Sequence, residues 1–538
     1  MDARVDIGKE ADNSRSILAR VFVAGSGGAV AAMGWLPPHQ PLALIAGLGV
    51  IFYFSGQARS IKELIYLGFF GSLVFFAIVN RPLVSAYGWG GWSDSAGMSV
   101  GSSSWWLLNG LWLLISVWGS VFWVLALSVY WWLRAEKAWL RIVVTVCVWI
   151  IVAEWLRSLT HWEFEWGFLG FALVDVAALR QWVSVFGLLF LSGMVVIASL
   201  FVVELVNGKM RNKLVLAAVG LGIGGLLWFG GERLAPRSSV NGISHEVAAF
   251  QFSPPVPPAG TTLLGISDLW LTSLSQFAAQ NYDLIVLPES ISSQAIELDS
   301  VATKKLGAGR RVAAEKWKQA FASILKPYPQ TYVAMGTESI ERGEVFNTTS
   351  IWDRDGLVGR QHKIHLVPFA EYLPFGWDFM GTQAVTYYQS GKVYLPIAAG
   401  DFQIGGFICQ EVQHADASRS LVKNGANILI TGGNDGVFAD HRVAQIHHSM
   451  ARIRATETGR YLVRAMKTGI SSIISPAGEA VSQSKGSGPV LVAAKVVLKD
   501  DETYWVRFGN WPILLLAQGF LVFLILLKRR LGDVDKGP

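Results

Sequence analysis

The sequence has 538 residues, of which 52% are hydrophobic and only 16% are charged. Together with a mean hydropathy of +0.40, this composition excludes an ordinary soluble protein and indicates a membrane protein. The formal net charge of +6 comes largely from basic residues that flank hydrophobic segments. It therefore gives no reason to expect a nucleic-acid partner.

The hydrophobic segments lie mainly in the first 230 residues, and each is near the length that a membrane-spanning helix needs. The sequence predicts about eight transmembrane helices, at residues 17–36, 41–55, 64–80, 105–131, 139–156, 183–205, 214–230 and 511–528. The chain accordingly divides into a membrane domain at 1–230 with about seven helices, a water-facing domain at 240–505, a last transmembrane helix at 511–528 and a tail at 529–538.

Lys and Arg residues between these segments indicate the orientation, because positively charged loops tend to stay in the cytoplasm. With eight spans, every basic joint falls on the same side of the membrane. The joints contain Arg4, Lys9, Arg15 and Arg20 at the N-terminus; Arg59 and Lys62; Arg134, Lys137 and Arg141; Lys209, Arg211 and Lys213; and, in the tail, Lys528, Arg529 and Arg530. We therefore expect a multi-pass protein of a bacterial inner membrane, with both termini cytoplasmic and residues 240–505 in the periplasm.

Between residues 240 and 505 the pattern changes to short β-type runs that alternate with helical stretches. Strands are predicted at 246–252, 283–290, 332–338, 348–353, 402–411 and 426–433, with further strands after residue 460. Helices are predicted at 307–325, 417–424 and 441–460. This order indicates an α/β domain built in layers.

Three residues of this domain are candidates for chemistry. Cys409 ends a strand, Glu289 ends another apolar strand, and Lys363 lies in the segment RQHKIHLVPFAEYLPF. Taken singly, each has a simpler interpretation, namely a buried core thiol, a strand-end cap and a solvated loop charge. A cysteine becomes a nucleophile only when a base or a cation stabilises its thiolate, so the three residues are informative as a group.

As a group, Glu289, Lys363 and Cys409 resemble the Glu-Lys-Cys site of the nitrilase (carbon-nitrogen hydrolase) superfamily, whose fold is an α-β-β-α sandwich. Combined with about eight spans, the chain resembles the apolipoprotein N-acyltransferase family. The similar segments, in chain order, are EWLR at 154–157, LPES at 287–290, HLVPFAEYLPF at 365–375, GGFICQE at 405–411, ARIRATETGR at 451–460 and SPAGE at 475–479.

The resemblance implies that Cys409 is the nucleophile, that Glu289 is the base that takes its proton, and that Lys363 stabilises thiolate and oxyanion. An adjacent ammonium would lower the pKa of the thiol. Glu371 matches a second carboxylate near the family's site. Glu411 would point to the opposite face if its strand continues, so we expect it to support the site rather than react.

The implied reaction moves an acyl chain from a phospholipid, typically phosphatidylethanolamine, onto Cys409 as a thioester. The α-amino group of the diacylglyceryl-cysteine of an apolipoprotein would then take the chain, which is the last step of lipoprotein maturation. No cofactor is implied. The alternatives are a membrane-tethered amidase or hydrolase in which water resolves the thioester, a paralogue with another acyl acceptor, and a catalytically silent lipid-binding or scaffolding protein.

Substrate recognition is assigned to two further groups of residues. The segment LPFGWDFMG at 373–381 is either a lid that dips into the membrane surface or a packed loop, and its apolar members are Phe375, Trp377, Phe379 and Met380. Gln410 and Asn434 are candidate pocket residues. The family's usual residues are replaced at Gln410, Gly436, Val437 and Lys467, and these departures concern substrate choice more than chemistry.

Three histidines on one predicted helix raise the question of a metal site. They are His441, His447 and His448. Adjacent residues on a helix do not share a face, so this spacing does not favour a shared ion. We expect no metal.

Overall fold

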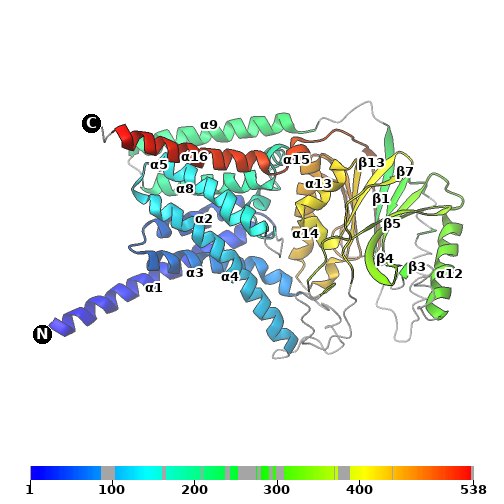
Figure 1. The fold of residues 1–538 in the computed structure, drawn as a ribbon, viewed down its shortest axis with the longest axis horizontal. Helices are drawn as coiled ribbons and strands as arrows, with labels where there is room; N and C mark the ends of the chain where they lie inside the picture. The colour runs from blue at the N-terminus through cyan, green and yellow to red at the C-terminus, as the bar shows by residue number, and fades with distance from the viewer. Residues whose placement is uncertain are drawn as a thin grey trace. The chain divides into compact units, whose positions relative to one another are not determined.

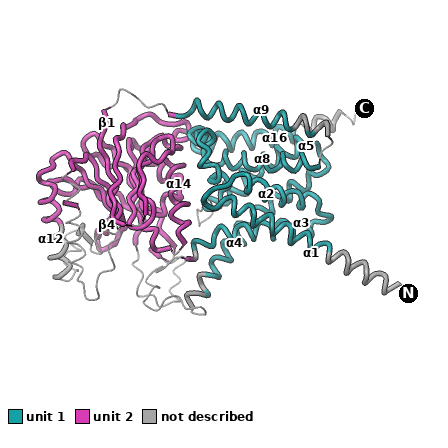
Figure 2. The backbone as a smooth tube through the Cα atoms, turned by 180° about the vertical axis from the view of Figure 1, so that it is seen from behind, with its two compact units in different colours: residues 1–84, 101–235, 508–538 teal, residues 85–100, 236–507 magenta. Residues whose placement is uncertain are grey.

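The computed structural model describes residues 2–85, 103–159, 165–207, 210–236, 243–252, 274–275, 280–289, 295–298, 308–368, 370–372, 388–438, 440–486 and 488–534. The chain separates into two compact units (Figure 2). Unit 1 comprises residues 1–84, 101–235 and 508–538, and unit 2 comprises residues 85–100 and 236–507.

Unit 1 is helical (Figure 1). Its long helices are α1 (Asp2–Trp35), α2 (Pro41–Gly56), α3 (Ile61–Asn80), α4 (Ser103–Trp132), α5 (Ala138–Val148), α8 (Leu188–Asn207), α9 (Met210–Leu234) and α16 (Trp511–Val534). A π-helix at Trp149–Leu156 continues α5. All the predicted hydrophobic segments are therefore largely helical.

Among the described residues, five helices are long and apolar enough to cross a membrane: Ser16–Trp35, Ile61–Leu83, Asn109–Ala135, Ala138–Leu156 and Leu188–Asn207. The apolar stretches Pro41–Gly56 and Trp511–Leu526 are shorter. The chain is thus a membrane protein with several apolar helices, and the number of eight spans stays a prediction.

One predicted segment is interrupted. The sequence suggested a continuous helix at 183–205, but a short helix α7 (Val183–Phe186) ends at Gly187 before α8 begins. Gly187 has a φ of +73°, a left-handed conformation that glycine adopts readily and that ends a helix. Hydrophobicity alone did not reveal this break, because both sides of it are apolar.

Close backbone contact packs the first three helices. A Cβ atom on Gly28 of α1 would lie 2.0 Å from the carbonyl oxygen of Gly71 in α3, and one on Gly47 of α2 would lie 2.3 Å from the amide nitrogen of Ala31. Small residues allow helix backbones to approach in this way inside membranes, where apolar burial alone does not drive association.

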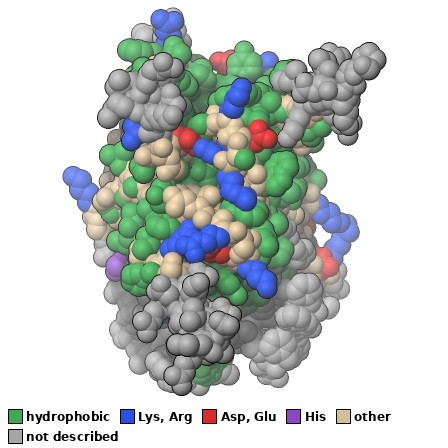
Figure 3. Space-filling model, turned by 90° about the vertical axis from the view of Figure 1, so that its left-hand side faces the viewer, with side chains coloured by type: hydrophobic (Ala, Val, Ile, Leu, Met, Phe, Trp, Pro, Cys, Tyr) green, Lys and Arg blue, Asp and Glu red, His purple; other side chains and the backbone are tan. Residues whose placement is uncertain are grey.

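The basic joints of unit 1 meet at one end of its helices. The Trp131 indole at the end of α4 donates to the Ala58 carbonyl oxygen between α2 and α3 at 2.7 Å, and Arg141 of α5 forms an ion pair with Glu204 of α8. Exposed basic residues at these joints are Arg59, Lys62, Arg134 and Lys137. Figure 3 views the protein from the side on which both termini lie in Figure 1, and Lys and Arg side chains are spread over it.

Unit 2 contains two sheets in its described part. The first has the order β13-β1-β2-β4-β5-β6, with β3 also paired to β4, and the second has the order β12-β11-β10-β9-β8-β7. The first sheet consists of β1 (Ser244–Gln251), β2 (Leu284–Val286), β3 (Ala295–Leu298), β4 (Tyr332–Glu341), β5 (Glu344–Asp353), β6 (Gly356–His362) and β13 (Val490–Val497). The second consists of β7 (Ile397–Ala399), β8 (Phe402–Ile408), β9 (Ile428–Gly433), β10 (Leu462–Met466), β11 (Ser472–Ile474) and β12 (Ala480–Gln483).

The two sheets pack face to face through an apolar core. Val247 and Leu284 of the first sheet meet Ile404, Ile428 and Val463 of the second in this core. Helix α12 (Ala308–Leu325) covers the other face of the first sheet, while α13 (Ala415–Lys423) and α14 (Arg442–Thr458) lie beyond the second (Figure 1). The result is the α-β-β-α layering that the resemblance to the nitrilase superfamily implied.

Parallel pairing brings several strand ends to one edge. Strands β8, β9 and β10 run parallel to one another, as do β1, β2 and β4. Because the carboxyl ends of parallel strands share an edge, the segments after β2, β8, β9 and β10 can hold side chains in proximity. Glu289, Cys409, Asn434 and Lys467 follow these four strands in that order.

Candidate active site

Cys409 lies at a sharp turn rather than within a strand. Strand β8 ends at Ile408, and a 3-10 helix spans Cys409–Gln413. The φ of Cys409 is +51°, a left-handed value that is uncommon for a residue with a side chain and is often found at functional sites. The predicted strand at 402–411 is therefore three residues too long, and the expectation that Glu411 continues the strand is wrong.

The Glu411 carboxylate stabilises this turn. It accepts hydrogen bonds from the Ile408 amide at 2.7 Å and from the Tyr394 hydroxyl at 2.6 Å. It also accepts from the amides of Ile364 and His365 at 2.8 and 3.1 Å. Glu411 thus joins the cysteine turn to the segment that follows Lys363.

Glu289, Glu371 and Lys363 form a connected polar cluster beside Cys409. The Lys363 ammonium donates to Glu371 Oε1 at 2.8 Å. The Asn347 amide group bridges the two carboxylates, since its Nδ2 donates to Glu289 Oε1 at 2.8 Å and to Glu371 Oε1 at 3.0 Å. The Cys409 thiol is hydrogen-bonded to the Glu289 side chain and receives a hydrogen bond from the Asn434 backbone N–H.

Glycines allow these elements to approach each other closely. A Cβ atom on Gly336 of β4 would lie 2.7 Å from Glu289 Cα, and one on Gly432 of β9 would lie 3.0 Å from the Glu289 amide nitrogen. A Cβ on Gly433 would lie 3.2 Å from Cys409 Cα. Larger residues at these positions would collide with the segments that carry Glu289 and Cys409.

Burial and charge set the protonation states at this site. Burial would lower the pKa of Lys363, but the carboxylates of Glu371 and Glu289 outweigh it, so the pKa is raised and the lysine stays charged. Burial raises the pKa of Glu289 above its ordinary value of 4.5, although Lys363 opposes this. A carboxylate that is less acidic than usual is a better proton acceptor near neutral pH.

The thiol itself behaves differently from the sequence-based expectation. Burial raises the pKa of Cys409, the Glu289 carboxylate raises it further, and Lys363 lowers it by less than the two together. The Cys409 thiol is therefore protonated. The Glu289 side chain is hydrogen-bonded to this thiol, as a base that takes its proton would have to be.

The structure brings some of the predicted site residues together, and others lie outside the residues that it describes. Glu289, Lys363 and Cys409 come together, and Glu371 contacts the lysine. Gln410 follows Cys409 in the 3-10 helix and is partly buried. Residues of the predicted lid, Phe375, Trp377, Phe379 and Met380, lie outside the described residues.

Asn347 is not among the site residues predicted from the sequence. It lies on β5 and is 6% exposed. The signal that could have pointed to it is an amide side chain beside a predicted buried strand, because a buried polar group needs hydrogen-bond partners. Which partners it has depends on strand pairing across the sheet.

The described residues contain one cluster with the spacing of metal ligands, formed by His365, His414 and Asp416, whose donor atoms lie within 4.8 Å of one another. The two imidazole rings stack with centroids 3.9 Å apart and an interplanar angle of 1°. A metal ion lies near the plane of each imidazole that binds it, so this stack would have to open before both rings could share an ion. Of the helix histidines, His447 contacts Asp435 and His448 contacts Ser472.

The chain is similar to several known proteins. Residues 246–500 match the family model of carbon-nitrogen hydrolases. The chain is 27% identical to an apolipoprotein N-acyltransferase of Allorhizobium ampelinum over 441 residues, which are 75% of this chain and 78% of the relative. It is 25% identical to that of Rhodopseudomonas palustris over 72% of this chain and 74% of the relative. A crystal structure of a carbon-nitrogen hydrolase from Helicobacter pylori matches with a TM-score of 0.38 and 16% identity, over 50% of this chain and 94% of that chain. The chain is therefore similar over about three quarters of its length to apolipoprotein N-acyltransferases, and residues 246–500 are similar to carbon-nitrogen hydrolases.

Proposed function

We propose that the protein transfers an acyl chain from a phospholipid, through a thioester on Cys409, to the α-amino group of the diacylglyceryl-cysteine of apolipoproteins. The observation that carries this proposal is the cluster of Glu289, Lys363 and Cys409 in a chain that also has membrane helices. Both substrates are lipids, which explains why such a site would be tethered to a membrane. Relatives over about three quarters of the chain bear the corresponding name.

In the first step the Glu289 carboxylate takes the thiol proton, and the Cys409 thiolate attacks the ester carbonyl of the phospholipid. The Lys363 ammonium stabilises the negative charge that develops on the carbonyl oxygen, a large effect when the donor is already in place. The ester C–O bond then breaks. The departing glyceryl oxygen takes the proton from Glu289, which leaves a lysophospholipid and a thioester.

In the second step the amine of the acceptor attacks the thioester carbonyl. Glu289 removes a proton from the attacking nitrogen, and Lys363 again stabilises the oxyanion. When the C–S bond breaks, the thiolate leaves and is reprotonated by Glu289. The products are an amide on the acceptor and the free enzyme, so no oxidant, reductant or cofactor is required.

An acyl adduct on Cys409 tests the enzyme proposal. Incubation of the purified protein with phosphatidylethanolamine is expected to add one acyl mass to the peptide that contains Cys409, as detected by mass spectrometry. Cys409→Ala should abolish the adduct, and Cys147→Ala, which changes the chain's other cysteine, should retain it. No adduct on the intact protein would favour the scaffold alternative.

The acceptor decides between transferase and hydrolase. Addition of a synthetic diacylated lipopeptide should speed the decay of the adduct and yield an N-acylated peptide. Equal decay with and without the peptide would instead indicate that water resolves the thioester, as in an amidase or hydrolase. Normal acylation of a Lys363→Ala variant would remove that lysine from the mechanism.

We also propose that the basic joints face the cytoplasm and that unit 2 faces the periplasm of a bacterial cell. The clustering of Arg59, Lys62, Arg134 and Lys137 at one end of unit 1 supports this orientation. In a chain without Cys147 and Cys409, a membrane-impermeant maleimide should label Lys485→Cys but not Lys137→Cys in cells with a permeabilised outer membrane. The opposite labelling would reverse the orientation.

A further inference from the structure

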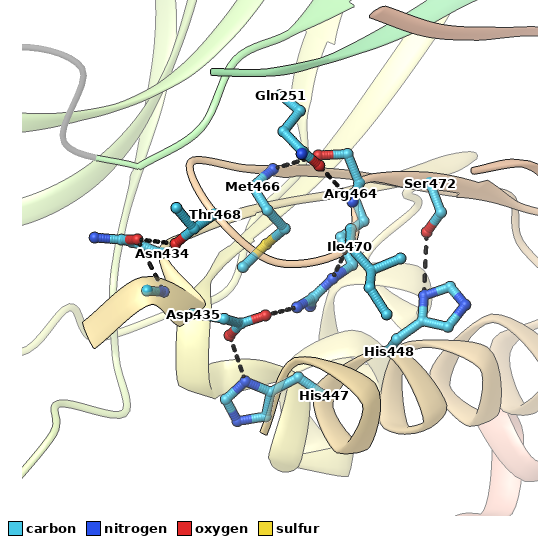
Figure 4. A network of polar contacts seen from close by, with 12 residues as sticks. Gln251, Asn434, Asp435, His447, His448, Arg464, Met466, Thr468, Ile470 and Ser472 are labelled. Carbon is cyan, nitrogen blue, oxygen red and sulfur yellow. Dashed lines mark hydrogen bonds and ion pairs between the residues drawn. The ribbon is translucent and has the colours of Figure 1, made fainter. Parts of the chain in front are cut away.

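Asp435 is a buried carboxylate that the proposed mechanism does not use. It begins the short 3-10 helix Asp435–Val437 after β9. Arg464 of β10 donates to its Oδ2 at 2.7 Å, and His447 of α14 is hydrogen-bonded to its Oδ1 at 2.8 Å. Figure 4 shows the carboxylate between these two side chains. All three residues are at most 5% exposed.

The partners of Asp435 are themselves held in place. The Arg464 Nε donates to the Ile470 carbonyl oxygen at 3.0 Å. The His447 Nε2 lies 3.2 Å from Gln413 Nε2, at the end of the 3-10 helix that begins with Cys409. The carboxylate is thus connected to β10, to α14 and to the cysteine turn, which are three segments far apart in the sequence.

The backbone around Asp435 is attached to the loop after β10. The Asp435 amide donates to the Thr468 carbonyl oxygen at 3.2 Å, and the Lys467 amide donates to the Gly433 carbonyl oxygen at 2.9 Å. The Thr468 hydroxyl donates to Asn434 Oδ1 at 2.8 Å (Figure 4). These bonds hold the turn at 433–435 against the loop after β10.

Gly436, one of the positions where the family's usual residue is replaced, lies next to this hydrogen-bonded turn. A Cβ atom on Gly436 would lie 2.0 Å from Thr468 Oγ1, and one on Gly469 would lie 2.6 Å from Asp435 Oδ2. The space that a side chain at position 436 would need is therefore taken by the Thr468 hydroxyl that bonds Asn434. Gly436 and Thr468 are matched to each other, and the replacement preserves the turn.

The turn at 433–435 packs against Cys409, since a Cβ atom on Gly433 would lie 3.2 Å from Cys409 Cα. The backbone N–H of Asn434, the residue just before Asp435, acts on the Cys409 thiol and lowers its pKa. We propose that Asp435 is a positioning residue: held by Arg464 and His447, it fixes this N–H against the sulfur. An N–H in this position stabilises the thiolate when Glu289 takes the proton, and again when the thiolate leaves the thioester. This role rests on Cys409 being the nucleophile of the proposed function.

The charge of Asp435 would act on the thiol in the opposite direction. Its negative charge by itself raises the pKa of Cys409. Burial would raise the pKa of Asp435, but Arg464 and His447 outweigh it and keep the carboxylate ionised. Removal of the charge without movement of the turn would therefore make Cys409 more reactive, whereas loss of the Asn434 N–H would make it less reactive.

The two effects change the reactivity of Cys409 in opposite directions, so its alkylation rate distinguishes them. In a Cys147→Ala background, the rate of Cys409 alkylation by iodoacetamide is measured from neutral to alkaline pH for the wild type and for Asp435→Asn, His447→Gln and His448→Gln. His448 is the matched control, because it is buried on the same helix but contacts Ser472 rather than Asp435. Thermal unfolding of each variant is followed in parallel.

We expect Asp435→Asn to lower the alkylation rate by about tenfold at a given pH, which corresponds to a rise of about one unit in the thiol pKa. His447→Gln should lower the rate in the same direction, and His448→Gln should leave it within about twofold of the wild type. If Asp435→Asn does not fold, the comparison of His447→Gln with His448→Gln decides.

An unchanged or faster alkylation of Asp435→Asn in a folded protein would overturn the positioning role, as would equal rates for the two histidine variants. The experiment contains no phospholipid or lipopeptide. A failure of the proposed acyl transfer would therefore leave this result standing, and a failure here would leave the acyl transfer standing.

Discussion

Asn347 offers a sharp test of how the site sets the protonation state of its base. The Asn347→Leu variant keeps approximately the same size and removes the N–H groups that contact Glu289 at 2.8 Å and Glu371 at 3.0 Å. Hydrogen bonds to charged groups contribute about 1.5–3 kcal/mol each. A pKa shift of one unit corresponds to about 1.4 kcal/mol, so loss of the bond to Glu289 should raise its pKa by about one to two units.

The sign of the effect on activity follows from the role of Glu289 as a base. The carboxylate must be ionised to accept the thiol proton, and a higher pKa leaves less of it ionised at neutral pH. As the pH is lowered, the rate of Cys409 acylation by phosphatidylethanolamine should therefore begin to fall at a higher pH than in the wild type. Its acid midpoint should rise by about one to two pH units, while the rate at alkaline pH should remain close to that of the wild type.

Asn427→Leu is the matched control for this experiment. Asn427 is also buried, at 7% exposure, but it contacts the Gln403 amide and the Asp401 carbonyl oxygen instead of the site. It should lower stability without moving the acid midpoint. An unshifted midpoint in folded Asn347→Leu, or an equal shift in Asn427→Leu, would refute the proposed control of Glu289 by Asn347.

Three further outcomes follow from the same structure. In the wild type, burial raises the pKa of Glu289 above 4.5. A pH–rate profile should therefore show acylation declining as the pH falls, with an acid midpoint above 4.5. A midpoint at or below 4.5 would contradict the role of Glu289 as the base. Lys363→Met should abolish acylation. It should also lower the free energy of unfolding in denaturant by about 3–5 kcal/mol, because it leaves the Glu371 carboxylate buried without its ammonium partner. An active variant would exclude the lysine from oxyanion stabilisation. Gly436→Ala should destabilise unit 2 by about 1–3 kcal/mol, because the new Cβ would lie 2.0 Å from Thr468 Oγ1. Adding Thr468→Ala should recover part of the lost stability. If the two substitutions lower the stability by strictly additive amounts, the two positions are not matched.

The sequence was most informative where local pattern is sufficient. Hydrophobic runs and alternation located β1, β5, α12, α13 and α14 within a few residues of their observed bounds. These elements depend on periodic burial, which the order of residues expresses directly. The length and hydrophobicity of the apolar segments likewise indicated a membrane protein, because the bilayer itself sets the required length.

The sequence was less informative where a boundary depends on one backbone conformation. Strand β8 ends three residues before the predicted limit because Cys409 adopts a φ of +51°. Nothing in the run FQIGGFICQE requires that conformation. It is stabilised by the Glu411 carboxylate, whose contacts come from Ile364, His365 and Tyr394 in other segments.

By itself, then, the sequence determined the class of the protein, the order of its elements and the identity of Glu289, Lys363 and Cys409 as a group. Only the tertiary structure decided that Asn347 bridges two carboxylates, that Asp435 is held by Arg464 and His447, and that the pKa of the Cys409 thiol is raised rather than lowered. The physical reason is common to all three. Each depends on burial and on distances between residues that are far apart in the chain, and local composition does not contain those distances.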